Sequence, residues 1–176
     1  MKMNEMALER ARLRFDMFDA DKDGYLQAAD FDAFAQRLIR VAGVVESSPK
    51  AQAVIDGHRG FFQALARSVD ENKDNKVSFE EYQRLVHTAG WFDDNIKPYA
   101  ESIAALGDKD NDGYIEKPEF VALLQAMSFK PENAESFFDA MDIDRDGRLS
   151  HHEWMQGIRA YYTDVDSAVA DTLVGK

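Results

Sequence analysis

The sequence predicts an all-α protein, because one twelve-residue pattern recurs four times along its 176 residues, between stretches of helical periodicity. The four copies span residues 19–30, 70–81, 108–119 and 142–153, and are called loops 1 to 4 below. The eighth position of each copy is aliphatic: Leu26, Val77, Ile115 and Leu149. The residue directly after each copy is aromatic: Phe31, Tyr82, Phe120 and Trp154. Apolar residues at helical spacing on both sides indicate that each loop joins two amphipathic helices.

Loop 3 shows why this pattern suits a hard cation. Asp108, Asp110 and Asp112 alternate along a tight turn, so their carboxylates converge on one point. The next residue is a glycine, which freely takes the positive φ that reverses the chain there. Tyr114 offers its backbone carbonyl, and Glu119 reaches back one helical turn later with both oxygens. Calcium takes roughly six to eight oxygen ligands, and this spacing is that of the EF-hand calcium loop.

Every loop offers side-chain oxygens at positions 1, 3, 5 and 12, and a backbone carbonyl at position 7. The expected calcium ligands are therefore Asp19, Asp21, Asp23, Tyr25 and Asp30 in loop 1; Asp70, Asn72, Asp74, Lys76 and Glu81 in loop 2; Asp108, Asp110, Asp112, Tyr114 and Glu119 in loop 3; and Asp142, Asp144, Asp146, Arg148 and Glu153 in loop 4.

Two loops depart from the full pattern. Loop 2 has Asn75 where the turn normally holds glycine, and only three of its ligand positions are carboxylates (Asp70, Asp74 and Glu81), so we expect it to bind weakest. Loop 1 ends in Asp30, which is one methylene shorter than Glu and suits octahedral Mg²⁺ better than seven-coordinate Ca²⁺. We therefore expect three or four bound Ca²⁺ ions, with loop 1 as a mixed Ca²⁺/Mg²⁺ site.

The loops are expected to work in pairs, joined by a short antiparallel β contact at their eighth positions. Residues 1–90 would then form an N-terminal EF-hand pair and residues 91–176 a C-terminal pair, with residues 90–93 as the only break between their helices. Ser48 followed by Pro49 predicts a helix start within the long connection between loops 1 and 2. The first helix also carries three arginines, for which we expect a solvated face: Arg10, Arg12 and Arg14.

The C-terminal tail predicts a short docking helix. Val165, Val169 and Leu173 share one helical face, Thr163 or Asp164 offers an N-cap, and Gly175 offers a stop. A free segment this short would not be helical alone in water. We therefore expect the tail to dock on the C-terminal EF-hand pair; the alternative is a frayed, disordered chain end.

Composition narrows the functional class. Acidic residues outnumber basic ones 33 to 21, giving a net charge of −12, so nucleic acid is an unsuitable partner. The chain has no cysteine, no apolar run of membrane-spanning length and a charged N-terminus, so we expect a soluble cytoplasmic protein without a membrane partner. His152 and Glu153 begin like a zinc-protease motif, but Gln156 replaces the second histidine, so we expect no enzyme. His151 and His152 are expected to be solvated.

The chain resembles the sarcoplasmic calcium-binding protein and calerythrin-type family of four-EF-hand proteins. Four loops in this length, the long interval between loops 1 and 2, and Asp30 at the end of loop 1 carry the resemblance. It implies two EF-hand pairs packed face to face as one globule, with calcium buffering or transport as the usual role. Members of this family commonly have a degenerate second or third loop, whereas loop 2 here keeps most of its oxygens.

Three functional readings follow. The first is a monomeric buffer that binds Ca²⁺ and Mg²⁺ without exposing new surface. The second is a sensor that opens on Ca²⁺ and captures a target helix, although the helices that follow the loops carry few methionines. The third is a relative of the luciferin-binding proteins and photoproteins, for which only His58 and Trp91 are plausible contributors to a chromophore cavity.

Overall fold

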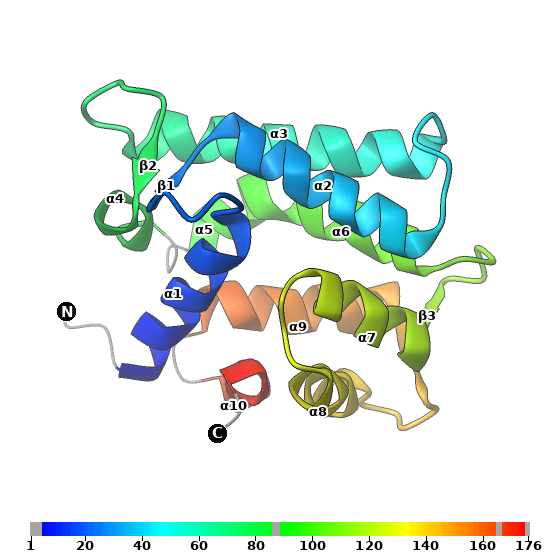
Figure 1. The fold of residues 1–176 in the computed structure, drawn as a ribbon. Helices are drawn as coiled ribbons and strands as arrows, with labels where there is room; N and C mark the ends of the chain where they lie inside the picture. Colours follow the sequence, from blue (N-terminus) through cyan, green and yellow to red (C-terminus); the bar gives the residue numbers. More distant parts are fainter. Residues whose placement is uncertain (1–4, 86–88, 165–166, 175–176) are drawn as a thin grey trace.

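The computed structural model describes residues 5–85, 89–164 and 167–174, which form one helical globule (Figure 1). The N-terminal half comprises α1 (Glu5–Phe18), β1 (Tyr25–Leu26), α2 (Ala28–Ala42), α3 (Pro49–Val69), β2 (Val77–Ser78) and α4 (Phe79–Gln83). The C-terminal half comprises α5 (Ala89–Trp91), η1 (Phe92–Ile96), α6 (Lys97–Gly107), β3 (Tyr114–Glu116), α7 (Lys117–Ala126), α8 (Pro131–Met141), β4 (Arg148–Ser150), α9 (His151–Thr163), α10 (Ala168–Asp171) and η2 (Thr172–Val174).

Local sequence signals set several helix ends, including the start predicted at Ser48 and Pro49. Ser48 caps α3 by accepting a hydrogen bond from the Ala51 backbone, and Pro49 occupies the first helical turn. The helix α2 ends at Gly43, whose φ of 71° is left-handed. Ser78 and Ser150 cap α4 and α9 and form capping boxes with the glutamates at loop position 12. The end of each of these two loops is therefore also the start of a helix.

The loops pair as expected through two short antiparallel ladders. Leu26 of loop 1 lies opposite Val77 of loop 2, and Ile115 of loop 3 lies opposite Leu149 of loop 4. All four of these aliphatic side chains are buried. Each ladder therefore joins the backbones of two loops, so the backbone positions of paired loops are coupled.

One hydrophobic core spans both halves of the chain. The helix α3 packs on α6, and both lie side by side across the molecule in Figure 1. Their close approach depends on Gly57, because a Cβ atom built there would lie 3.3 Å from the Cα atom of Tyr99. The Tyr99 ring contacts Phe61 from the first half, with ring centroids 5.2 Å apart. The Trp154 indole of α9 donates a 2.8 Å hydrogen bond to the carbonyl of Ala100.

The expected break at residues 90–93 is wrong. These residues belong to α5 and η1, which lead into α6 through a π-helical turn. Trp91 packs against Phe61 and donates to the hydroxyl of Ser68, so this segment is held against α3. Short helical segments such as these are not stable alone in water, and packing against the core stabilises them.

The solvated arginine face is also wrong for two of its three members. Arg10 and Arg14 are fully buried, whereas Arg12 is half exposed. Arg14 donates to the carbonyl of Tyr161 at 2.9 Å, and Arg10 donates to the carbonyl of Asp164 at 2.9 Å. The last carbonyls of a helix have no partner within it and carry a partial negative charge. The two guanidinium groups therefore cap the C-terminal end of α9.

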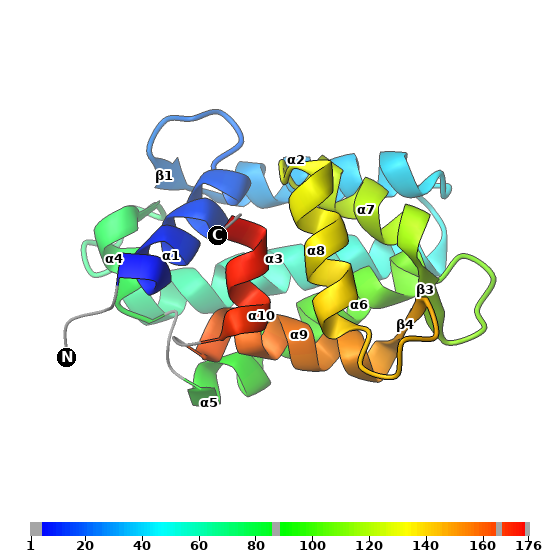
Figure 2. The same cartoon turned by 90° about the horizontal axis from the view of Figure 1, so that it is seen from below.

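The tail lies against α8 and α9 in the described structure, as the red helix beside them in Figure 2 shows. Ala170 and Leu173 are buried, with 0% and 3% of their surface exposed. Asn133 of α8 donates to the carbonyl of Leu173 at 3.2 Å. The N-cap is Ser167 rather than the expected Thr163 or Asp164. The expected contributions of Val165 and Gly175 lie outside the described residues.

Within the described ranges, no helix is both long enough and apolar enough to cross a membrane.

Candidate metal centres

The four loops share one backbone conformation. Position 4 is left-handed in each, with φ of 60° at Lys22, 58° at Lys73, 62° at Asn111 and 60° at Arg145. Position 6 is also left-handed, with φ of 87° at Gly24, 60° at Asn75, 92° at Gly113 and 85° at Gly147. Asn75 thus takes the left-handed conformation that glycine takes in the other three loops. This conformation costs energy for a residue with a side chain. All four loops therefore have the backbone shape of an EF-hand calcium loop.

Backbone hydrogen bonds orient the carboxylates within each loop. In loop 3, Asp108 Oδ2 accepts from the Gly113 backbone at 3.0 Å, and Asp112 Oδ1 accepts from Tyr114 at 2.9 Å. The same two contacts recur in loop 4, from Gly147 to Asp142 at 3.0 Å and from Arg148 to Asp146 at 2.8 Å. At least one oxygen of each of these four carboxylates is thus held by the backbone, and both oxygens of Asp108 and Asp142 are.

Three loops gather an acidic cluster that fits a calcium ion. The clusters are Asp19, Asp21 and Asp30; Asp108, Asp110 and Asp112; and Asp142, Asp144 and Glu153. In each cluster one ligand atom from every residue lies within 4.8 Å of the others. Among the described residues, Asp19 Oδ1 is buried and lacks a hydrogen-bond donor. A buried carboxylate oxygen without a donor is costly, and a bound cation would satisfy it.

The carboxylate at position 12 clamps the loop to the start of the following helix. Asp30 accepts from the backbones of Ala20 and Gln27, at 3.0 and 2.8 Å. Glu153 accepts from those of Ile143 and Ser150, both at 2.9 Å. Burial raises the pKa of the Asp30 carboxyl above its ordinary value. Metal binding at these loops therefore draws on a carboxylate that is already held near the ion position.

Loop 3 differs at this twelfth position. Glu119 is absent from its cluster, and Glu119 Oε1 lies 3.4 Å from Lys109 Nζ, the side chain at position 2 of the same loop. Position 9 of this loop is Glu116 instead of the serine found in loops 2 and 4. Glu119 must leave Lys109 before it can bind an ion with both oxygens.

Loop 2 differs at its third position. The Asn72 amide donates to Asp74 Oδ2 at 3.0 Å, so one of the few carboxylates of this loop is engaged by its neighbour. Glu81 accepts from the Ser78 backbone at 2.9 Å, and this hydrogen bond lowers the pKa of the Glu81 carboxyl. Within residues 70–81 no group of three acidic side chains converges as in the other loops.

The side chains at position 7 form a feature that the sequence reading missed. Only their carbonyls were expected to matter, yet the side chains pair across each ladder. Arg148 lies over the Tyr114 ring with its guanidinium 4.0 Å from the centroid, and Lys76 lies 5.4 Å from the Tyr25 centroid. Arg148 also bridges Asp112 and Asp146, at 3.4 Å from each. The sequence carries a signal for this pairing: position 7 is a tyrosine in loops 1 and 3 and a cation in their partners, loops 2 and 4.

The expectation that His151 is solvated is wrong in one respect. His151 is partly exposed, but its Nε2 atom lies 3.3 Å from Asp108 Oδ2, the first acidic residue of loop 3. The His151 backbone also donates to the carbonyl of Gly113 at 3.3 Å. Position 10 of loop 4 therefore reaches the neighbouring loop, because the β ladder places the two loops back to back.

His58 and Trp91, the two residues considered for a chromophore cavity, both pack against aromatic side chains of the core. His58 packs between Phe34 and Tyr99, with centroids 5.1 and 4.8 Å away, and its Nδ1 donates to the Val54 carbonyl at 2.7 Å. The apolar hollow beside Tyr99, Trp154 and Leu173 measures about 30 Å³. That volume is on the order of one water molecule and is far below the size of a small organic ligand.

Two family models match the chain. The model described as an EF-hand domain pair covers residues 8–86, and the model described as an EF hand covers residues 106–124 and 134–158. All four loops lie within these matches.

Similar proteins are known from bacteria and from animals. Calerythrin of Saccharopolyspora erythraea is 26% identical over 163 residues, which are 89% of this chain and 92% of that protein. The luciferin-binding protein of Renilla reniformis is 25% identical over 96% of this chain and 92% of its own length.

Solved structures agree with the fold. A calcium-binding protein of Streptomyces coelicolor, described as acting in prokaryotic calcium-mediated regulation, superposes with a TM-score of 0.80 and 27% identity. That match covers 89% of this chain and 98% of the other. A sarcoplasmic calcium-binding protein from amphioxus superposes with a TM-score of 0.77 and 18% identity, over 99% of both chains. The three chains therefore share the same overall fold.

Proposed function

The chain belongs to the four-EF-hand calcium-binding family of calerythrin and the sarcoplasmic calcium-binding proteins, and on this premise we propose that it is a calcium buffer. In this proposal it is a cytoplasmic monomer that takes up Ca²⁺ and Mg²⁺ and covers its apolar interior in every metal state. Its strongly acidic composition would be partly neutralised by the bound ions.

We assign the ions to the loops by their ligand chemistry. In each of loops 1, 3 and 4, three acidic side chains converge, and these loops are proposed as the sites with the higher calcium affinity. Loop 2 is proposed as the weakest, because Asn72 replaces a carboxylate and also engages Asp74. Loop 1 is proposed to hold Mg²⁺ at resting calcium, because Asp30 is too short to add a second oxygen easily. The position-7 carbonyls of Tyr25, Lys76, Tyr114 and Arg148 complete the proposed ligand sets.

The docked tail is the observation that supports a buffer over a sensor. Ala170 and Leu173 are buried against α8 and α9, on the C-terminal pair where a sensor would expose a groove for its target. Arg10 fixes the same segment from α1, by donating to the Ser167 carbonyl at 3.3 Å and pairing with Asp171 at 3.2 Å. A surface already occupied by the chain itself is unavailable to a partner helix.

A calcium titration with a neutral apolar dye tests this proposal. N-phenyl-1-naphthylamine fluoresces on apolar surface, so the Ca²⁺ form, with or without millimolar Mg²⁺, is expected to bind little of it. The substitution Leu173→Asp should raise dye binding several-fold, because a carboxylate cannot stay buried at this position. Ala168→Asp is the matched control, since it adds the same charge on the exposed side of the tail. Strong dye binding by the parent Ca²⁺ form would favour a sensor instead.

A further inference from the structure

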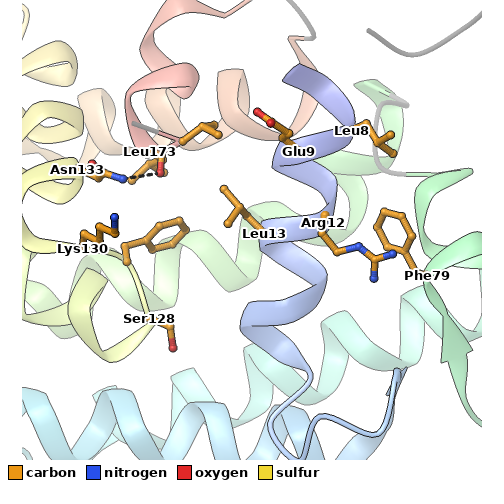
Figure 3. Close-up of a pocket in the computed structure, with 11 residues that line it drawn as sticks. Leu8, Glu9, Arg12, Leu13, Phe79, Ser128, Lys130, Asn133 and Leu173 are labelled. Carbon is orange, nitrogen blue, oxygen red and sulfur yellow. Dashed lines mark hydrogen bonds between the residues drawn. The ribbon is translucent and has the colours of Figure 1, made fainter. Parts of the chain in front are cut away.

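A surface groove of about 580 Å³ lies between α1, the C-terminal tail and the connection from α7 to α8 (Figure 3). It is separate from the four loops, except that Phe79 at its rim is position 10 of loop 2. Its volume falls in the range that accommodates small organic ligands, roughly 300–1,000 Å³. The metal sites do not use this groove, which shares Leu173 with the docked tail.

The middle of the groove is apolar. Leu13 projects into its centre in Figure 3, and Phe129 of the α7–α8 connection and Leu173 and Val174 of the tail also line it. Leu8, at the outer end, leaves 41% of its surface exposed, which is unusual among the large hydrophobic residues of this protein. An apolar ligand seated here would remove this surface from water, which favours binding.

Two cations flank this apolar floor on opposite sides of Leu13 (Figure 3). Arg12 stacks on Phe79, with its guanidinium 3.6 Å from the ring centroid, which leaves the edge of the guanidinium free to donate. Its ion pair with Asp16 is long, at 3.9 Å, and half exposed, so it is weak. The Lys130 amine has no hydrogen bond or ion pair with any residue in the described part of the chain, although the Lys130 backbone carbonyl accepts from Asn133 and Ala134.

The charge balance of the groove favours an anion. The chain as a whole carries −12, yet the groove is lined by two cations and one carboxylate, that of Glu9. Glu9 has an interaction of its own within the protein. An apolar molecule with a single negative group would bury the floor and engage Arg12 or Lys130 in a charge-assisted hydrogen bond.

We propose that this groove binds a small apolar anion, such as an aryl or acyl carboxylate or sulfonate, with its apolar body over Leu13 and its charge on Arg12 or Lys130. The site is independent of calcium buffering, and its test does not depend on the outcome of the titration above.

Two dyes with the same apolar body test the proposal. The anionic dye 8-anilinonaphthalene-1-sulfonate and the neutral dye N-phenyl-1-naphthylamine differ only in the sulfonate. The calcium-saturated parent protein is expected to bind the anionic dye at one site, more than about tenfold tighter than the neutral dye. Equal affinities, or tighter binding of the neutral dye, would overturn the proposal.

Charge variants locate the site. The double variant Arg12→Gln/Lys130→Gln should lose the preference for the anionic dye, while Arg12→Lys/Lys130→Arg should retain it. Arg40→Gln/Arg67→Gln removes the same charge from two exposed arginines outside the groove and should also retain it. If this control loses the preference as fully as the groove variant, the effect is one of net charge and the proposal fails. Circular dichroism of each variant establishes that the fold is kept.

Discussion

Arg14 of the first helix donates a 2.9 Å hydrogen bond to the carbonyl oxygen of Tyr161 near the end of the last long helix. Its guanidinium also lies over the rings of Tyr161 and Tyr162, 4.9 and 4.8 Å from their centroids. Because α1 leads directly into loop 1, this contact connects the N-terminal metal site to the C-terminal pair. Residues 147 positions apart in sequence thus share one buried polar contact.

Replacement of Arg14 by Met should destabilise the protein. The Tyr161 carbonyl would lose its donor at a buried position, which costs about 1–3 kcal/mol in free energy of unfolding. Urea denaturation of the calcium-saturated protein measures the change. Arg12→Met is the control on the same helix, since the Arg12 side chain is 51% exposed and loses chiefly its stacking on Phe79, about 0.5–1 kcal/mol. Equal effects of the two substitutions would show that the buried contact is unimportant.

The position-12 carboxylates should rank the loops. Glu153→Gln is expected to remove a tight binding event, because Glu153 belongs to a converged cluster and is held by the Ile143 and Ser150 backbones. Glu81→Gln should remove a weak event or none, because loop 2 lacks such a cluster. Isothermal titration with Ca²⁺ resolves the two cases. The ranking is wrong if Glu81→Gln abolishes the tightest binding.

Lys109 should weaken calcium binding at loop 3. Its amine holds Glu119 at 3.4 Å, so Lys109→Gln frees this carboxylate and should raise the affinity of loop 3 several-fold. Lys117→Gln makes the same charge change in the same loop, but the Lys117 amine contacts Asp139 instead. A similar gain in both variants would assign the effect to general charge rather than to the release of Glu119.

Loop 1 should respond to magnesium more than loop 4 does. Asp30→Glu adds the methylene that a bidentate ligand needs, so it should shift loop 1 from Mg²⁺ toward Ca²⁺. Calcium titrations in the presence and absence of millimolar Mg²⁺, on the parent and the variant, measure this preference. The argument from side-chain length fails if Mg²⁺ leaves calcium binding at loop 1 of the parent unchanged.

His58 should make stability depend on acidity. Burial lowers the pKa of His58 from 6.5 to about 4, so the ring is neutral in the folded protein and the unfolded chain takes up its proton first. Its contribution is therefore complete above about pH 6.5 and is lost as the pH falls toward 4, by about 3 kcal/mol in total. Urea denaturation of the parent and of His58→Phe across this range isolates the effect, because the carboxylates titrate equally in both. Parallel pH profiles would contradict it.

Much of the architecture could be predicted from short stretches of sequence. The left-handed turn at Gly113, the capping boxes at Ser78 and Ser150, and the pairing of Ile115 with Leu149 all depend on residues within one loop or on its repeated pattern. Such features are local, because a cap or a turn is stabilised by groups only a few residues away. The family resemblance rests on the same repeated pattern.

The sequence by itself determined the four loops, their shape and their pairing, because each is encoded within about twelve residues. Only the tertiary structure decided which side chains meet across the globule: Arg10 and Arg14 at the end of α9, His151 beside Asp108, and Arg12 and Lys130 on either side of one groove. From the sequence alone, an arginine on a helix is expected to be solvated, because its neighbours in the fold are not known. A buried arginine needs unpaired carbonyl oxygens from another part of the chain as acceptors. No local sequence pattern predicts that this distant contact forms.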